Sequence, residues 1–310
     1  DHRDLHSFPT RRSSDLYIGF DSLSFASSPH LDTKEGRIYL KLELEALKMA
    51  LTSENPVADI NAALIFRQYR HQLFSNAKEL ENYLETGEGL AEYTGLISCG
   101  MDDKQIKNHL VSQIDWFYQM PTFIRSFAYF TLPVYGYFMQ QTNKKWNLEI
   151  SKNTNLSDYI FAFFKVNIQT WQEQEILKIG KKYNYDGISI FENQREIKKI
   201  KLLCKYKSMF LSDSAFKIPL EKMNFSFSPG NLVPLDSFGT VYPNLRITDN
   251  WGILQVDSIG ALMAANYKYI TVSHPESIND NEISGNGWKL KLNKNWKLKK
   301  LDSNFTVVKE

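Results

Sequence analysis

The sequence predicts a two-part α+β chain, in which a mainly helical region precedes an antiparallel all-β region. Between residues 33 and 212, apolar residues recur at helical spacing. After residue 212, short alternating runs are separated by Gly, Asn, Asp and Pro at intervals of about 8–12 residues, which is typical of an antiparallel sandwich or barrel. The chain has 310 residues, of which 43% are hydrophobic and 23% charged. That composition is ordinary for globular domains and argues against disorder.

The helical elements follow from apolar periodicity and from capping residues. Asp32 or Thr33 is the expected N-cap of the first helix, and Glu35 lies in its first turn. Pro133 is expected to kink the helix that contains it. The further helices are expected over residues 57–74, 76–97, 104–118, 123–141, 156–164, 172–183 and 188–210.

The β region is expected to begin near residue 213, so the predicted domains are 17–212 and 213–310. Its clearest strands are expected over 246–248, 252–257, 269–273, 288–292 and 305–308. In residues 288–300, Lys alternates with Leu and Trp. We interpret this run as the exposed face of an edge strand, where Lys blocks further pairing. Contact with a polysaccharide, a membrane surface or a nucleic acid is the alternative.

The charge balance excludes some partners. The net charge of +2 argues against a strongly basic nucleic-acid binder, so we expect no nucleic-acid partner. Residues 17–100 carry 7 basic and 12 acidic side chains. Such an acidic stretch suits a cation site, although an excess of Glu on helix surfaces is the simpler explanation.

The number of cysteines and the hydropathy argue against a disulfide-rich protein and against a membrane span. Cys99 and Cys204 are too few for a disulfide framework, and we expect free, buried thiols rather than one bridge. The most apolar stretch, residues 126–139, is interrupted by Thr131 and Pro133. It is shorter than the roughly 18 residues that a membrane span needs, so no span is expected.

Residues 1–16 show no helical or strand period and no apolar face. They resemble a translated sequencing-adapter read, which implies a non-native segment that has replaced upstream sequence. A disordered basic arm is the alternative. We therefore leave His2 and His6 out of any metal site.

The segment EGLAEYTG, residues 88–95, carries the strongest chemical signal. Glu88 and Glu92 are four residues apart and share one face of a helix. Gly87 and Gly89 flank Glu88, although each glycine costs a helix about 1 kcal/mol. Close approach of another backbone or of a ligand would explain the glycines. A surface helix with two small residues for packing is the simpler alternative.

This segment resembles the third-ligand helix of the gluzincin metallopeptidases. The resemblance implies that Glu88 is the third ligand of a catalytic zinc and that Glu92 orients a ligating histidine. The segments 30–47, 63–74 and 126–139 are similar to secreted bacterial metallopeptidase-like proteins, in which an H-E-x-F-H-type helix lies just upstream of the position of Tyr17. The resemblance therefore implies a zinc-dependent peptidase, a peptide or protein substrate, and a secreted or periplasmic location.

The chain departs from that family in one decisive way, because no H-E-x-x-H motif occurs in its 310 residues. We therefore expect a fragment that is inactive as given and that binds zinc weakly or not at all. A non-catalytic secreted or envelope binding protein, with the β domain as the binding part, is the alternative.

Secondary candidates surround this motif. Tyr129 is the candidate oxyanion stabiliser. Arg125, four residues earlier, is expected to assist it or to hold a substrate carboxylate, unless both residues belong to an aromatic core. Arg67, Arg70 and His71 are expected on a solvated helix face.

Overall fold

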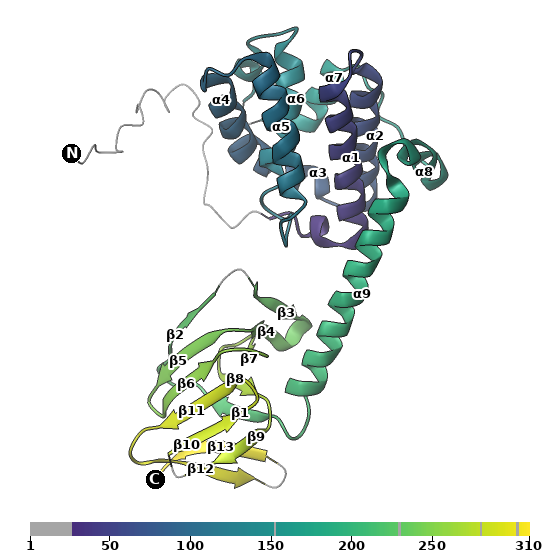
Figure 1. Cartoon of the computed structure of the whole chain (residues 1–310). Coiled ribbons are helices and arrows are strands. Elements are labelled where there is room, and N and C mark those ends of the chain that lie inside the picture. The colour runs from purple at the N-terminus through teal and green to yellow at the C-terminus, as the bar shows by residue number, and fades with distance from the viewer. Residues whose placement is uncertain (1–26, 152, 229–230, 280, 302–303) are drawn as a thin grey trace, which may run out of the picture. The chain divides into compact units, whose positions relative to one another are not determined.

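The computed structural model describes residues 27–151, 153–228, 231–279, 281–301 and 304–310. The chain divides into two compact units, Asp1–Gln194 and Arg195–Glu310. The predicted α+β organisation is confirmed, because helices occupy the first unit and antiparallel sheets the second (Figure 1). The division falls within helix α9, and the first strand begins at Phe216. The predicted non-native segment, residues 1–16, lies outside the described residues.

The helices lie close to their predicted positions. They are α1 (Lys34–Thr52), α2 (Val57–Leu73), α3 (Ala77–Leu84), α4 (Leu90–Ser98), α5 (Asp103–Phe117), α6 (Ala128–Gln140), α7 (Leu156–Phe163), α8 (Glu173–Gly180) and α9 (Tyr185–Phe210). Short 3-10 turns are η1 (Pro29–Asp32), η3 (Trp146–Glu149) and η4 (Lys181–Tyr183), with η6 (Asp236–Phe238) in the β unit. A π-helical turn, η2 (Glu85–Gly89), joins α3 directly to α4. The single helix expected over residues 76–97 is therefore continuous but contains a π segment.

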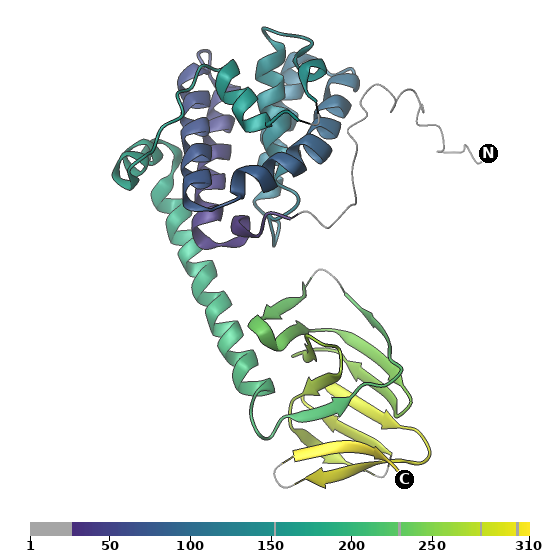
Figure 2. The ribbon, with the colours of Figure 1, turned by 180° about the vertical axis from the view of Figure 1, so that it is seen from behind.

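Local capping explains where α1 begins. The Thr33 hydroxyl accepts a hydrogen bond from the Gly36 amide at 3.0 Å, which confirms Thr33 as the N-cap. α1 packs along α2 and also contacts α5 and α6, and Figures 1 and 2 both show α1 and α2 side by side. α1 is therefore a central helix that buries most of its surface, including Lys41 and Glu43.

Arg37 ties the start of the described chain to the helical unit. Its guanidinium pairs with Asp32 at 3.1 Å and with Glu192 at 2.9 Å, and it stacks on the Phe123 ring at 3.6 Å. Lys41 pairs with the same Glu192 carboxylate at 2.5 Å. These contacts hold η1, α1, the segment before α6, and the first part of α9 together.

The second unit consists of short antiparallel strands. They are β1 (Phe216–Pro219), β2 (Asn224–Phe227), β3 (Val233–Leu235), β4 (Gly239–Tyr242), β5 (Leu245–Asp249), β6 (Gly252–Val256), β7 (Ala261–Ala264), β8 (Tyr269–Val272), β9 (Pro275–Ile278), β10 (Glu282–Gly285), β11 (Trp288–Leu292), β12 (Trp296–Leu301) and β13 (Asn304–Lys309). One sheet has the order β1-β8-β7-β4-β3, a second has the order β2-β5-β6-β11-β10-β9, and β12 pairs with β13.

Alternation along β11 places side chains on two faces. Trp288, Leu290 and Leu292 are buried in the core of the β unit, whereas Lys289 and Lys291 are exposed. The predicted exposed Lys face is thus confirmed. The expected edge position is wrong for β11, because this strand pairs with both β6 and β10. The pairing of β11 with β6 joins residues 32 to 40 positions apart, so the residues next to β11 in the sequence do not indicate it.

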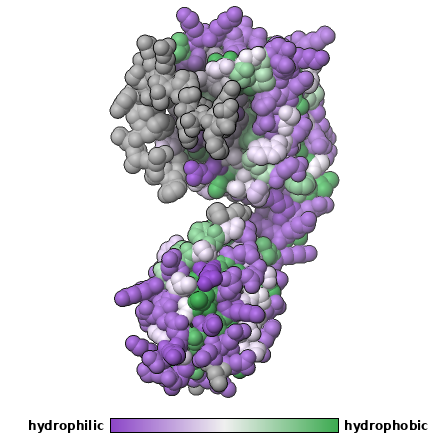
Figure 3. Space-filling view, turned by 60° about the vertical axis from the view of Figure 1, so that its left-hand side comes forward, coloured by the Kyte–Doolittle hydropathy of each residue, from purple (hydrophilic) through white to green (hydrophobic). Residues whose placement is uncertain are grey.

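The surface is polar over most of the face shown in Figure 3, with hydrophobic residues in small patches. Cys99 and Cys204 are free, as expected, but both are exposed, so the predicted burial is wrong. Cys99 is the C-cap residue of α4, just beyond the last helical residue. Among the described residues, no helix combines the length and apolar character that crossing a bilayer requires.

Candidate functional site

The π-helical turn η2 positions the predicted metal ligand Glu88. Within this turn Glu85 is fully buried, whereas Glu88 is half-buried. A Cβ added to Gly89 would lie 2.9 Å from the Leu132 Cβ and 3.0 Å from the Ala128 carbonyl oxygen. The close approach of α6 therefore explains this glycine. Because π turns recur at functional sites, the backbone of η2 favours a functional role for Glu88.

The predicted residues gather around this turn. The Tyr129 hydroxyl, on α6, donates a hydrogen bond to the Glu88 carboxylate. This bond, with partial burial and the negative charges of Glu88 and Glu92, raises the pKa of Tyr129 to about 12, against the opposing charge of Arg125. The phenol therefore stays protonated near neutral pH and acts as a donor. Glu92 and Arg125 are exposed, and both lie near enough to act on Tyr129 electrostatically.

The described residues do not fit a zinc ion by themselves. Among them, no group of three His, Cys, Asp or Glu side chains is arranged to hold a metal. A catalytic zinc needs three protein ligands, and Glu88 supplies one. His30 and His71 instead bind Glu81, at 2.7 and 3.0 Å. No reaction at a metal follows from these residues.

A buried ion-pair network lies behind η2, and it overturns the expectation that Arg67 and Arg70 face solvent. Both guanidinium groups are 0% exposed. Arg67 donates to Glu43 at 2.8 Å and makes two hydrogen bonds to Glu85, at 2.7 and 2.9 Å. Arg70 donates to Glu43 at 2.7 Å and makes two hydrogen bonds to Glu81, at 2.6 and 2.8 Å. The three carboxylates are also fully buried, so these acidic residues do not belong to solvent-exposed helix faces.

Neutral donors complete the network. The Tyr135 hydroxyl donates to Glu43 at 2.9 Å, and the Thr131 hydroxyl donates to Glu85 at 2.6 Å. Both residues lie on α6, which therefore links the network to the Glu88–Tyr129 contact. The sequence signal was available in α2, where two arginines three residues apart share one helix face. Their acidic partners could not be chosen from sequence, because they lie on α1, α3 and η2.

The network predicts acid sensitivity of the helical unit. Burial alone would raise the pKa of Glu81, but the charges of Arg70 and His71 and the hydrogen bonds with Arg70 and His30 outweigh it, so this pKa lies well below its usual range. The stabilisation is therefore complete above the unfolded-state pKa of about 4.3 and is lost as the pH falls below it. We expect the urea midpoint, followed by far-UV circular dichroism, to fall below about pH 5. Glu81→Gln should be less stable at neutral pH and show a shallower acid dependence, and equal slopes would contradict the assignment.

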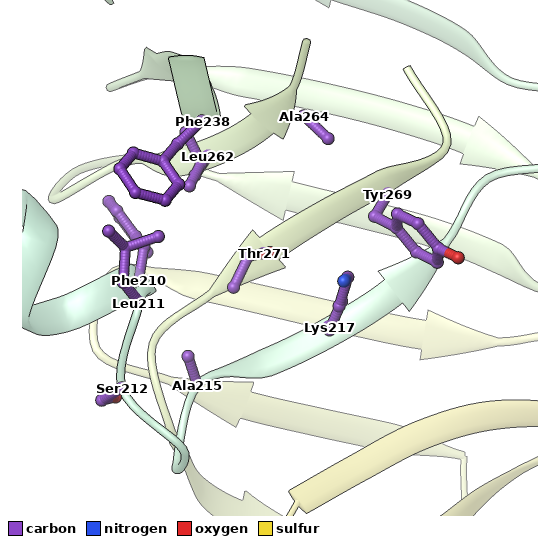
Figure 4. Close-up of a pocket in the computed structure, with 10 residues that line it drawn as sticks. All are labelled: Phe210, Leu211, Ser212, Ala215, Lys217, Phe238, Leu262, Ala264, Tyr269 and Thr271. Carbon is purple, nitrogen blue, oxygen red and sulfur yellow. The ribbon is translucent and has the colours of Figure 1, made fainter. Parts of the chain in front are cut away.

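The β unit contains a hollow of about 210 Å³ on the sheet that includes β1, β7 and β8. Figure 4 shows Phe210, Phe238 and Leu262 at one end and Lys217 with Tyr269 at the other. The Lys217 ammonium lies 4.1 Å from the centroid of the Tyr269 ring. Because Phe238 is 47% exposed, the hollow presents both an aromatic surface and a cation to solvent.

Comparisons of the chain with protein-family models, with curated proteins and with solved structures find no match.

Proposed function

We propose that the chain is a segment of a zinc-dependent peptidase, in which Glu88 is the third metal ligand and Glu92 orients a histidine ligand. We expect no peptide hydrolysis by the 310 residues alone, because the H-E-x-x-H motif that supplies two ligands and the general base does not occur in them. The observation that carries the proposal is the meeting of Glu88, Glu92, Arg125 and Tyr129 at the π turn η2.

The contact between Glu88 and Tyr129 supports the assigned roles. A carboxylate that accepts a hydrogen bond from a phenol is oriented, as ligating carboxylates are in metal sites. A protonated Tyr129 beside the ligand position is also suitably placed to donate to a developing oxyanion. Arg125 is exposed beside this pair, so a substrate carboxylate can reach its guanidinium group.

Zinc binding tests the proposal. We expect the 310-residue chain to bind zinc weakly or not at all, and the intact protein containing this unit to bind one zinc tightly. In that protein, Glu88→Gln should abolish tight binding and Glu92→Gln should weaken it by about 10–100-fold. Glu79→Gln, an exposed carboxylate on α3, is the control and should change nothing.

Elemental analysis of dialysed protein and competition with a chelator measure these effects. Tight stoichiometric zinc in the 310-residue chain would mean that the ligands are assigned wrongly. Unchanged zinc content in Glu88→Gln of the intact protein would contradict the role of Glu88.

Ligand binding by the β unit is the second candidate function, and the hollow in Figure 4 favours it. An exposed Phe238 and the Lys217–Tyr269 pair offer an aromatic surface beside a cation, which suits binding rather than catalysis. The native sequence upstream of Tyr17 separates the two candidates. An H-E-x-x-H motif there favours the peptidase, and its absence favours the binding protein.

A further inference from the structure

The helical unit contains a cavity that is separate from the Glu88 site. Its volume is about 370 Å³, within the roughly 300–1,000 Å³ of pockets that bind small ligands. Side chains of α2, α7 and the start of α3 line it, together with the segment after α7. Phe161 and Ile168 form its apolar part, and His71, Lys78 and Thr170 supply polar groups.

One wall of this cavity is held in place by two glutamines. The Gln68 amide donates to the Asn167 carbonyl at 3.0 Å and accepts from the Trp171 indole at 2.9 Å. The Gln72 amide accepts from the Trp171 backbone N–H at 2.9 Å and donates to its carbonyl at 3.1 Å. The wall is therefore formed before any ligand arrives, and the glutamines are already engaged. Recognition of a polar ligand is left to the other polar groups.

The buried network fixes one of these groups, His71. Its side chain is only 9% exposed, and its Nε2 lies 3.0 Å from the Glu81 carboxylate. Arg70 keeps Glu81 ionised, and an ionised carboxylate only accepts hydrogen bonds. The His71 Nε2 therefore carries a proton, and the ring is oriented by a charged partner. His71 therefore contributes a polar side chain to the cavity wall, and the orientation of its ring does not depend on a ligand.

Lys78 is the cation of the cavity. Its ammonium donates two hydrogen bonds to Asp158, at 2.7 and 2.8 Å. An ammonium has three donors, and within the described part of the chain two of them bind Asp158, which leaves one for a ligand. Asp158 is 47% exposed, which makes it a competitor for Lys78 that solvent and ligands can displace.

We propose that this cavity binds a small organic carboxylate with an aliphatic tail. The ligand carboxylate would bind the free donor of Lys78, and its tail would pack against Phe161 and Ile168. This inference does not depend on the peptidase assignment, because the cavity shares no residue with the Glu88 site.

Isothermal titration of the 310-residue chain with isovalerate tests the proposal, and isovaleramide is the uncharged control. N-acetyl-leucine, which carries the same tail and charge, tests whether a peptide C-terminus is an alternative source of the carboxylate. Binding of isovalerate alone indicates a free acid, whereas tighter binding of N-acetyl-leucine indicates a peptide C-terminus, and both results support the site. Equal binding of isovaleramide, or binding of neither acid, would overturn it.

Two substitutions have opposite expected signs. Lys78→Met should weaken isovalerate binding by about tenfold or more, because it removes a charge-assisted hydrogen bond. Asp158→Asn should strengthen binding several-fold, because it frees the ammonium of Lys78. A gain in affinity cannot come from misfolding, so this second variant keeps the test informative.

The Lys48–Asp115 pair provides matched controls, since it is a partly exposed Lys–Asp pair at 2.6 Å in the same unit. Lys48→Met and Asp115→Asn should leave isovalerate binding unchanged. If Asp115→Asn strengthens binding as much as Asp158→Asn, the effect is one of overall charge and the proposed site is wrong.

Discussion

Replacing Arg67 with methionine is expected to lower the free energy of unfolding of the helical unit by about 3–5 kcal/mol. The substitution leaves the Glu85 carboxylate buried without its guanidinium partner and removes one of the two cations around Glu43. Removing one partner of a buried ion pair costs more than the pair itself contributes, because the remaining charge stays out of water. Urea unfolding followed by far-UV circular dichroism measures the change, since that signal comes mainly from helices.

The control is Lys48→Met, which breaks the partly exposed pair with Asp115 and should cost about 0–1 kcal/mol. The double variant Arg67→Met, Glu85→Gln should recover part of the loss, because no unpaired charge then remains at Glu85. A loss below about 1 kcal/mol for Arg67→Met would contradict the buried network.

Gly36→Ala is expected to destabilise the helical unit, although alanine normally favours a helix over glycine by about 1 kcal/mol. A Cβ at this position would lie 1.9 Å from the His30 carbonyl oxygen. The contact involves backbone, so η1 must move away from the start of α1. That movement also disturbs His30, whose Nε2 lies 2.7 Å from Glu81. We expect a loss of about 1–3 kcal/mol, as for other overpacked sites.

Gly95→Ala is the matched control for Gly36→Ala. Gly95 lies within α4, is exposed, and has no atom within 4 Å of the position that a Cβ would take. The same chemical change should therefore stabilise the unit by about 0.5–1 kcal/mol. Thermal and urea unfolding of the two variants should shift in opposite directions. Shifts of the same sign would mean that helix propensity, rather than the contact with His30, determines the effect at Gly36.

The elements that the sequence predicted well depend on residues close together along the chain. The N-cap hydroxyl of Thr33 bonds to the Gly36 amide three residues later, and the first helix begins where this spacing predicts. Alternation over residues 288–292 likewise predicted which side chains of β11 face the core. Periodicity and capping act within a few residues, so one segment contains all the information they need.

In the candidate site, some features follow from residues close together in the sequence and others from contacts between distant residues. The pair Glu88 and Glu92 was found from its spacing within one helix. The contact with Tyr129 joins residues 41 positions apart, and the sequence offered Tyr129 as a candidate without determining this contact. In the π turn, Glu85 is buried and Glu88 is half-buried, and Gly89 packs closely against α6, which lies about 40 residues later in the chain and is not specified by neighbouring residues.

The sequence alone determined the two-part organisation and most helix positions, because apolar period and breaker residues are local properties. The tertiary structure alone decided that Arg67 and Arg70 are buried and which strands are neighbours. Arg67 reaches Glu43 across 24 positions and Glu85 across 18, and β1 pairs with β8 across 50 to 56. An arginine next to apolar residues in the sequence is compatible with a solvent-exposed helix face or with a buried ion pair. The free-energy difference between an exposed and a buried arginine depends on whether carboxylates distant in the sequence lie next to the guanidinium group and compensate its lost hydration. Only the folded chain places them there.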